Sequence, residues 1–223
     1  MILPSSALAG VTCAFGVLAV SISLHAAPFT NGSFEVGPSV PTLPGYLTLL
    51  SDDTSITGWT VLPSSSIDYI GSLWTSEDGA HSLDLSGAAA GGVEQTFDTI
   101  QGRSYVVRFY LAGNTACGAV VKGMDVGVTG NATVHYTFDT SGHSPTSMGW
   151  QQQEYDFVAP GSSATLVFQS TEPSGCGPAL DNVSVTEVKP VPALSPFARL
   201  AAALLLLTLG LVFVGRRSWS SNR

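Results

Sequence analysis

Charged residues are scarce in this chain of 223 residues, making up 11% of it, against about 25% in a typical globular domain. Positive charge is scarcest, because eight Lys and Arg stand against 16 Asp and Glu. All 16 acidic residues, but only four of the basic ones, lie in residues 35–189, which gives this segment a net charge of −12. A segment of this charge repels phosphate backbones, which excludes nucleic acid as a partner.

Sequence motifs of catalysis are also missing. The chain contains no Gly-x-Ser-x-Gly elbow, no His-Glu-x-x-His pair and no phosphate loop. The neighbouring carboxylates Asp52-Asp53 and Glu77-Asp78 would point to opposite faces of a strand and so would not form an acid/base pair. We therefore predict that the protein is not an enzyme. An uncharacterised enzyme is kept only as a third and weaker alternative, after the two functions given at the end of this section.

Long apolar runs occur at both ends of the chain. Residues 1–26 are predicted to be a secretory signal peptide, with an apolar stretch from Ala7 to Leu24 and small residues at Ala26 and Ala27. The alternative is an uncleaved N-terminal anchor, since no Lys or Arg precedes this stretch. Residues 189–198 are predicted to be a Pro-rich linker with a sorting motif.

Residues 199–223 are predicted to form a transmembrane helix with a basic tail. Arg216-Arg217 after the apolar run favours a cytoplasmic end, and the alternative is a helix buried in a soluble core. The tail resembles the bacterial exosortase-type sorting signals, with Val191-Pro192-Ala193-Leu194-Ser195 similar to a motif that begins Ile-Pro-Thr-Leu-Ser. This resemblance implies an exosortase-type processing protease as partner and the periplasm or cell surface of a Gram-negative bacterium as location.

The segment between the two ends, residues 27–188, alternates repeatedly between apolar and other residues, with Gly, Pro, Ser, Asn or Asp clusters about every ten residues. The alternating sets are Ile67/Tyr69, Leu83/Leu85, Tyr105/Val107/Phe109/Leu111, Met124/Val126/Val128, Val134/Tyr136/Phe138, Tyr155/Phe157, Ala164/Leu166/Phe168 and Val183/Val185. A period of two residues with regular turn signals is typical of an antiparallel β-sandwich. The sequence therefore predicts an all-β fold for this segment.

Two cysteines, Cys117 and Cys176, remain once the signal peptide is removed. An even number of cysteines in an exported domain favours a disulfide between them. Two free thiols or a metal-binding pair are the alternatives, although two thiolates with no histidine close in sequence make a poor zinc site.

Several motifs in this segment occur in the order of a known family. They are Asn31-Gly32-Ser33-Phe34-Glu35, Thr57-Gly58-Trp59, Ile67-Asp68-Tyr69-Ile70, Ser82-Leu83-Asp84-Leu85, Glu94-Gln95-Thr96-Phe97, Leu111-Ala112-Gly113-Asn114, Phe138-Asp139-Thr140, Met148-Gly149-Trp150 and 176–185. In this order they resemble the DUF642 family, called the choice-of-anchor C domain in bacteria. The resemblance implies a galactose-binding-like jelly-roll β-sandwich without catalytic residues, and plant relatives are cell-wall proteins with proposed polysaccharide contacts.

Three residues are candidates for binding. Trp74 lies in a polar, loop-like sequence and is either an exposed platform for a sugar or part of the core, whereas we expect Trp59 and Trp150 to be core residues. Glu35 and Asp181 are predicted to hold a structural Ca²⁺, because the sequence resembles carbohydrate-binding modules whose first and last strands are neighbours and place a calcium ion there. Alternatively, the two carboxylates accept hydrogen bonds from backbone N–H groups at strand ends.

Together these observations predict an exported, membrane-tethered, non-catalytic carbohydrate-binding module that contacts envelope or extracellular polysaccharide. The alternative from a different class is a structural surface or matrix protein that packs against other proteins.

Overall fold

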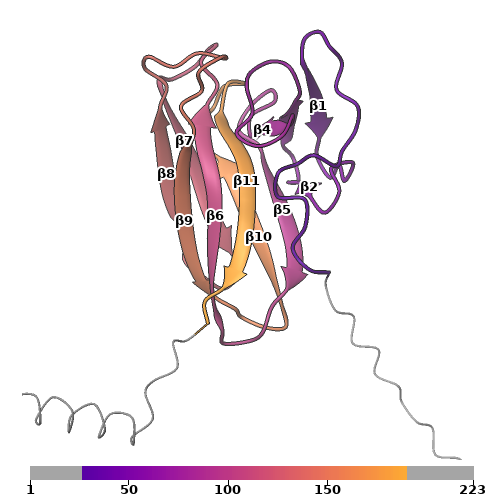
Figure 1. Cartoon of the computed structure of the whole chain (residues 1–223), viewed down its shortest axis with the longest axis vertical. Coiled ribbons are helices and arrows are strands. Elements are labelled where there is room, and N and C mark those ends of the chain that lie inside the picture. Colours follow the sequence, from indigo (N-terminus) through magenta and orange to yellow (C-terminus); the bar gives the residue numbers. More distant parts are fainter. Residues whose placement is uncertain (1–26, 190–223) are drawn as a thin grey trace, which may run out of the picture.

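The computed structural model describes residues 27–189. The predicted signal peptide (1–26), all but the first residue of the linker (189–198) and the predicted transmembrane helix (199–223) lie outside the described residues. No helix long and apolar enough to cross a membrane occurs in the described segment. This segment consists of strands joined by turns and loops (Figure 1).

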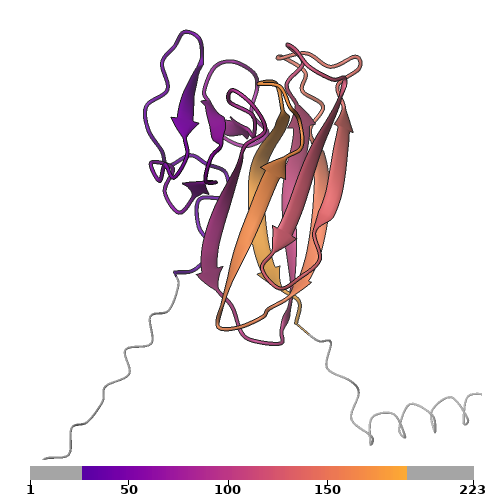
Figure 2. The same cartoon turned by 180° about the vertical axis from the view of Figure 1, so that it is seen from behind.

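The strands form two antiparallel sheets that face each other. Sheet A has the order β1-β3-β4-β11-β6-β9, and sheet B has the order β2-β5-β10-β7-β8. Figure 1 shows sheet A in front and Figure 2 shows sheet B in front. The bounds are β1 Tyr46–Leu50, β2 Thr60–Val61, β3 Ser66–Ile70, β4 Ser82–Asp84, β5 Gly92–Asp98, β6 Ser104–Gly113, β7 Val121–Val128, β8 Val134–Asp139, β9 Gln151–Val158, β10 Ser163–Ser170 and β11 Pro178–Glu187.

The predicted all-β sandwich is confirmed, because the alternating residues form strands whose apolar side chains meet between the sheets. Phe109 of sheet A and Phe168 of sheet B are fully buried and contact edge to face, with ring centroids 5.1 Å apart. Trp59 is 2% exposed and packs against Phe34 and Phe168, so its predicted place in the core is also confirmed. Burial of large aromatic side chains dominates the energetics of such a core.

Three strands were not anticipated from the sequence, namely β1, β2 and β5. In β5 the inward positions are held by Val93, Gln95 and Phe97, and the amide of Gln95 interrupts the apolar pattern. This amide is 3% exposed and is satisfied by the backbone of Thr30, through a 2.9 Å bond to its N–H and a 3.0 Å bond to its carbonyl. A buried polar side chain with both of its groups paired can replace an apolar one in a strand.

The predicted disulfide between Cys117 and Cys176 is confirmed, with a Cα–Cα distance of 5.4 Å. It joins the loop between β6 and β7 to the segment that enters β11. Lys122, fully buried at the inner face of β7, donates hydrogen bonds from Nζ to the carbonyls of both cysteines, at 2.6 Å and 2.8 Å. Burial lowers the pKa of Lys122, and the charges of Glu172 and Asp84 oppose this effect.

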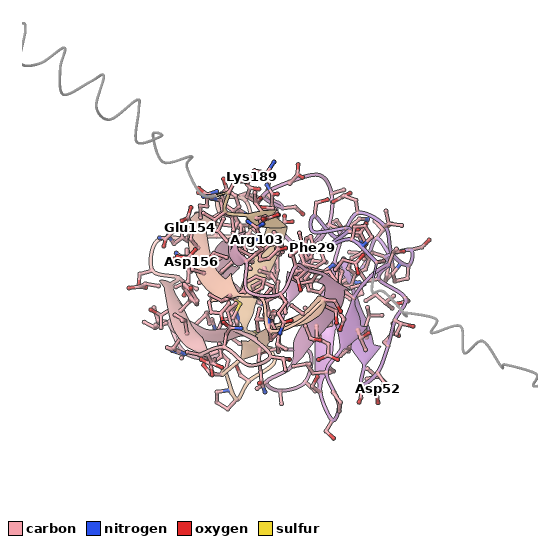
Figure 3. All side chains as sticks on the ribbon, turned by 90° about the horizontal axis from the view of Figure 1, so that it is seen from below. Phe29, Asp52, Arg103, Glu154, Asp156 and Lys189 are labelled. Atoms are coloured by element: carbon pink, nitrogen blue, oxygen red, sulfur yellow. A yellow bond between two sulfur atoms is a disulfide. The ribbon has the colours of Figure 1, made fainter. Side chains whose placement is uncertain are left out.

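Both ends of the described segment lie at the same end of the sandwich. Phe29 and Lys189 appear together in the view from below (Figure 3), and the chain leaves the sandwich there in Figure 1. The segment contains its own buried core and its own disulfide. We therefore expect residues 27–189 to fold as an independent domain.

Candidate functional site

Trp74 lies in the core and does not form an exposed platform. Its side chain is 6% exposed, and its indole Nε1 donates a 2.9 Å hydrogen bond to Ser82 Oγ on β4. Of the two alternatives for Trp74, the structure supports the core position, because the polar residues that follow it belong to a loop bonded to Asp181 on sheet A. Trp150, expected in the core, is half-buried and donates from Nε1 to the carbonyl of Thr75 at 3.1 Å.

Glu35 and Asp181 hold one loop, residues 77–81, from two sides. Asp181 Oδ2 accepts hydrogen bonds from the backbone N–H groups of Glu77 and Asp78 at 2.8 Å and 3.1 Å. Glu35 Oε1 accepts from the N–H groups of Ala80 and His81 at 2.9 Å and 2.8 Å. These contacts match the alternative in which both carboxylates bond backbone N–H groups. We call this arrangement the loop clamp.

The expected neighbourhood of the first and last strands is wrong. Between β1 and β11 lie β3 and β4, and Glu35 lies in a loop before β1. The segment of Glu35 approaches β11 through its backbone instead, because the N–H of Val183 donates to the carbonyl of Gly32 at 2.8 Å. Glu35 and Asp181 were expected to meet because the first and last strands were expected to be neighbours, and these strands are not neighbours in sheet A.

The residues of the loop clamp do not fit a calcium ion. Ca²⁺ requires six to eight oxygen ligands, whereas Glu35 Oε1 and both oxygens of Asp181 already face N–H donors. Residues 27–189 contain no group of three or more His, Cys, Asp or Glu side chains that could hold a metal ion. N–H dipoles directed at a carboxylate stabilise its negative charge in place of a cation.

Two buried aspartates have strongly raised pKa values. Burial raises the pKa of Asp181 to about 7, although the N–H groups of Asp78, Asn182 and Glu77 favour its ionised form. Burial likewise raises the pKa of Asp84 to about 7, against hydrogen bonds from Asn114, Ser86 and Gly177. Both side chains are fully buried, so the loss of hydration outweighs the hydrogen bonds.

A polar groove with a volume of about 390 Å³ lies on the outer face of sheet B. It is lined by Asp125, Gly127, Val128, Thr129, Gly130, Asn131, Thr133, Val167 and Gln169. We call it the sheet-B groove. The register places Gly127 of β7 beside Val167 of β10, and Asp125 beside Gln169. Met124 and Val126, the neighbours of these outward residues in β7, are fully buried in the core.

Glycine is what hollows the sheet-B groove. A Cβ added to Gly127 would lie 3.0 Å from Thr133 Oγ1, so a side chain at this position would occupy the groove. Glycine inside a strand often marks a close approach of a ligand or of another backbone. The predicted alternation of Met124, Val126 and Val128 already implied that Asp125 and Gly127 face outward, and this was the signal in the sequence that could have located the groove.

The polar groups of the sheet-B groove are partly free. Asp125 Oδ1 bonds His135 Nδ1 at 2.7 Å, while its Oδ2 has no partner in the described segment. The side chains of Gln169, Thr129 and Thr133 also make no hydrogen bond to other residues of 27–189. Asn131 is engaged, because its side chain pairs with the N–H and carbonyl of Val158 at 3.1 Å each. The groove thus offers an amide, two hydroxyls and a carboxylate oxygen to a ligand.

A second cavity of about 540 Å³ lies at the lower end of β8 and β9. Its lining is mainly apolar and includes Tyr105, Tyr155 and Phe157. These rings are 8%, 2% and 3% exposed, and their faces pack in the sandwich, with Tyr105 stacked on Phe157. They therefore present no open ring face for stacking of a flat ligand.

We expect the free energy of unfolding to fall as the pH rises from about 4 to about 7. Asp84 and Asp181 ionise near pH 4 in the unfolded chain but near 7 in the folded protein. The folded state therefore binds more protons in this window, and its stability decreases with pH by on the order of a few kcal/mol. Urea unfolding of residues 27–189 at pH 4.5 and pH 8, followed by tryptophan fluorescence, measures the change.

In Asp181→Asn and Asp84→Asn, each of which removes one of the titrating groups, this pH dependence should be smaller than in the unaltered domain. A free energy of unfolding that increases between pH 4.5 and pH 8, or a pH dependence in each variant as large as that of the unaltered domain, would contradict the assignment.

We expect calcium to leave the melting temperature unchanged. An ion that binds only the folded state must raise the melting temperature, and the loop clamp is already closed by N–H donors. Thermal melts of residues 27–189 in EDTA and in millimolar Ca²⁺ test this, with Glu35→Gln as the matched variant. A calcium-dependent rise that is lost in Glu35→Gln would restore the predicted metal site.

Comparison with known proteins finds a relative that is much longer than this chain. It is 36% identical over 162 residues to halomucin of Haloquadratum walsbyi, an alignment that covers 70% of this chain and 2% of that protein. The chain thus spans a small fraction of the length of this relative.

Solved structures with a similar arrangement of strands include carbohydrate-binding modules. A CBM35 from Paenibacillus barcinonensis has 17% identity and a TM-score of 0.42, covering 63% of this chain and 98% of that one. TmCBM61, solved in complex with β-1,4-galactotriose, has 16% identity and a TM-score of 0.42, covering 73% and 99%. The family described as Protein of unknown function (DUF642) matches residues 27–186, and the chain belongs to this family.

Proposed function

We propose that this protein is an exported, membrane-tethered, non-catalytic carbohydrate-binding module, and that the sheet-B groove is its binding site for envelope or extracellular polysaccharide. The observation that carries the proposal is the set of unpaired polar groups beside the glycine floor of this groove. Sugar hydroxyls both donate and accept hydrogen bonds, so they are complementary to amide, hydroxyl and carboxylate groups. The groove has these groups at Gln169, Thr133 and Asp125.

The shape of the sheet-B groove supports an extended ligand. Its residues run along β7 from Asp125 to the turn at Thr129 and Gly130, and Gly127 lets a ligand approach the backbone between them. A polysaccharide presents hydroxyls along its length, and each neutral hydrogen bond adds about 0.5–1.5 kcal/mol.

The same lining argues against glycoside hydrolysis. Hydrolysis of a glycosidic bond generally uses two carboxyl groups that flank the bond. The residues that line the sheet-B groove include a single carboxylate, Asp125, which is bonded to His135. We therefore propose that the protein binds its ligand without cleaving it.

Export and tethering are proposed from the sequence of the two ends, and the disulfide supports export. Disulfides such as Cys117–Cys176 persist mainly in oxidising compartments outside the cytoplasm. The chain leaves the sandwich at the end where Lys189 lies (Figure 3). A tether at this end leaves the outer face of sheet B open to polysaccharide. The proposed anchor is the apolar run before Arg216-Arg217, of the exosortase-sorted type.

We expect Gly127→Leu to abolish polysaccharide binding while the fold is retained. The leucine side chain would occupy the groove at the position where a Cβ already meets Thr133. Affinity should fall about tenfold or more, because several hydrogen bonds of about 1 kcal/mol each are lost. Affinity electrophoresis of residues 27–189 in gels that contain soluble polysaccharides measures the effect.

The matched control for this variant is Thr186→Leu, which adds an equally large side chain at an exposed position of β11 in sheet A. It should bind as the unaltered domain does. Equal binding by the Gly127→Leu and Thr186→Leu variants would exclude the sheet-B groove as the site.

We expect a reporter fused after Lys189 to be active outside the cytoplasm and one fused after Arg223 to be active inside. The apolar run followed by Arg216-Arg217 motivates this topology. Paired fusions to alkaline phosphatase, which is active when exported, and to a fluorescent protein, which is active in the cytoplasm, test it. Cytoplasmic activity of the fusion after Lys189 would contradict tethered export.

A further inference from the structure

We infer that the sheet-B groove selects polysaccharides without acidic groups and excludes those built from uronic acids. This inference rests on the proposed function and names the substrate class of the same site. It follows from the charges that surround the groove on the outer face of sheet B.

The outward positions of sheet B carry negative charge on three of its five strands. Glu94 and Asp98 lie on β5, Asp125 on β7 and Asp139 on β8, and each is preceded in its own strand by a buried, inward-facing residue. The single group on this face that can become positive is His135, and it is paired with Asp125 at 2.7 Å. Glu94 lies beside the groove residue Val167 and Asp125 lines the groove itself, so a uronate chain there would meet one carboxylate from β5 and one from β7.

The four basic residues in the described segment lie elsewhere. Arg103 lies near Glu187, and Arg108 is paired with Glu154 at 2.6 Å on sheet A. Lys122 is fully buried and bonded to the cysteine carbonyls. Lys189 lies at the lower end of the sandwich, directly after Val188, whose N–H donates to the carbonyl of Ser104 (Figure 3). Recognition of a carboxylate by a protein typically uses Arg or Lys, and the outer face of sheet B has neither.

A divalent cation could otherwise bridge a uronate to the carboxylates of the protein. Such a bridge needs several hard oxygen ligands that converge on one point. Within residues 27–189 no group of three or more metal-ligating side chains is brought together. Repulsion on this face is thus not compensated by a bound ion, and at an ionic strength of about 0.15 M it acts over roughly 8 Å, which covers direct contact in the groove.

The hydrogen-bonding groups of the groove point to the same class of ligand. The free Oδ2 of Asp125 is an acceptor and requires a donor from the ligand. A sugar hydroxyl provides this donor, whereas an ionised uronate carboxylate has none. Gln169 and Thr133 can each donate and accept, so they bond hydroxyls in either direction. The groove is therefore complementary to hydroxyls, and a carboxylate placed against Asp125 would find no hydrogen-bond donor on that side chain.

Affinity electrophoresis of residues 27–189 in EDTA tests the inference, with laminarin, galactan and mannan as neutral probes and with polygalacturonate and alginate as acidic probes. We expect at least one neutral polymer to retard the domain, with loss of retardation in Gly127→Leu, and no retardation by either acidic polymer. Retardation by an acidic polymer alone, lost in Gly127→Leu, would overturn the inference while leaving the proposed function intact. Retardation by none of the five polymers would overturn both.

A variant with reversed charge on the outer face of sheet B tests whether acidic polymers are excluded by charge repulsion or by the shape of the groove. Glu94→Lys combined with Thr137→Lys adds two positive charges on the outer face of sheet B, outside the residues that line the groove. We expect this variant to keep its retardation by the neutral polymer and to gain at least tenfold in affinity for polygalacturonate. Unchanged exclusion of polygalacturonate, in a variant that still binds the neutral polymer, would show that charge is not the selecting property.

Discussion

The pairing of β10 with β5 on one side and β7 on the other is the constraint on which the rest of the structure depends. In this register Leu166 of β10 lies beside Gln95 and Val128, and Phe168 lies beside Val93 and Val126. These inward side chains are almost fully buried. A shift of the register by one residue would move every one of them to solvent. The same pairing brings Val167 beside Gly127 and Gln169 beside Asp125 on the outer face, so the core and the groove have one common cause.

Sheet A has a different outer face, because part of it is covered by the chain. Residues 77–81 are held over it by Asp181 and Glu35, and Trp74 packs beneath the same loop against Ser82. Ser82 is fully buried and accepts the hydrogen bond of Trp74, whereas Asp84 is buried by contacts with Ser86, Asn114 and Gly177. The pKa values of Asp84 and Asp181 are both raised by loss of hydration on burial, although different segments bury the two carboxyl groups. Among residues 27–189 no equivalent loop lies over Gly127, and this difference leaves the groove on one side of the sandwich.

The sequence was sufficient to predict the core strands, because period-two alternation is a local signal that each strand carries by itself. It also predicted Cys117–Cys176, which follows from cysteine number and compartment. It could not place Trp74 or Glu35, since the course of a loop depends on distant residues such as Asp181. In β5 the buried amide of Gln95 concealed the pattern, because its partner Thr30 lies 65 residues away in sequence. The sheet-B groove was not predicted from the sequence for a related reason. Its two walls come from β7 and β10, and only the register of the folded sheet brings these strands together.

The central claim is that polysaccharide binds on the outer face of sheet B. Its most direct test is an NMR titration of ¹⁵N-labelled residues 27–189 with oligosaccharides cut from whichever polymer binds. The account predicts that the largest changes in chemical shift fall on the backbone amides of Gly127, Thr133 and Gln169, with little change on sheet A. Changes concentrated at Arg108, Tyr110 and Gln152 on the opposite sheet, with none at Gly127, would contradict it.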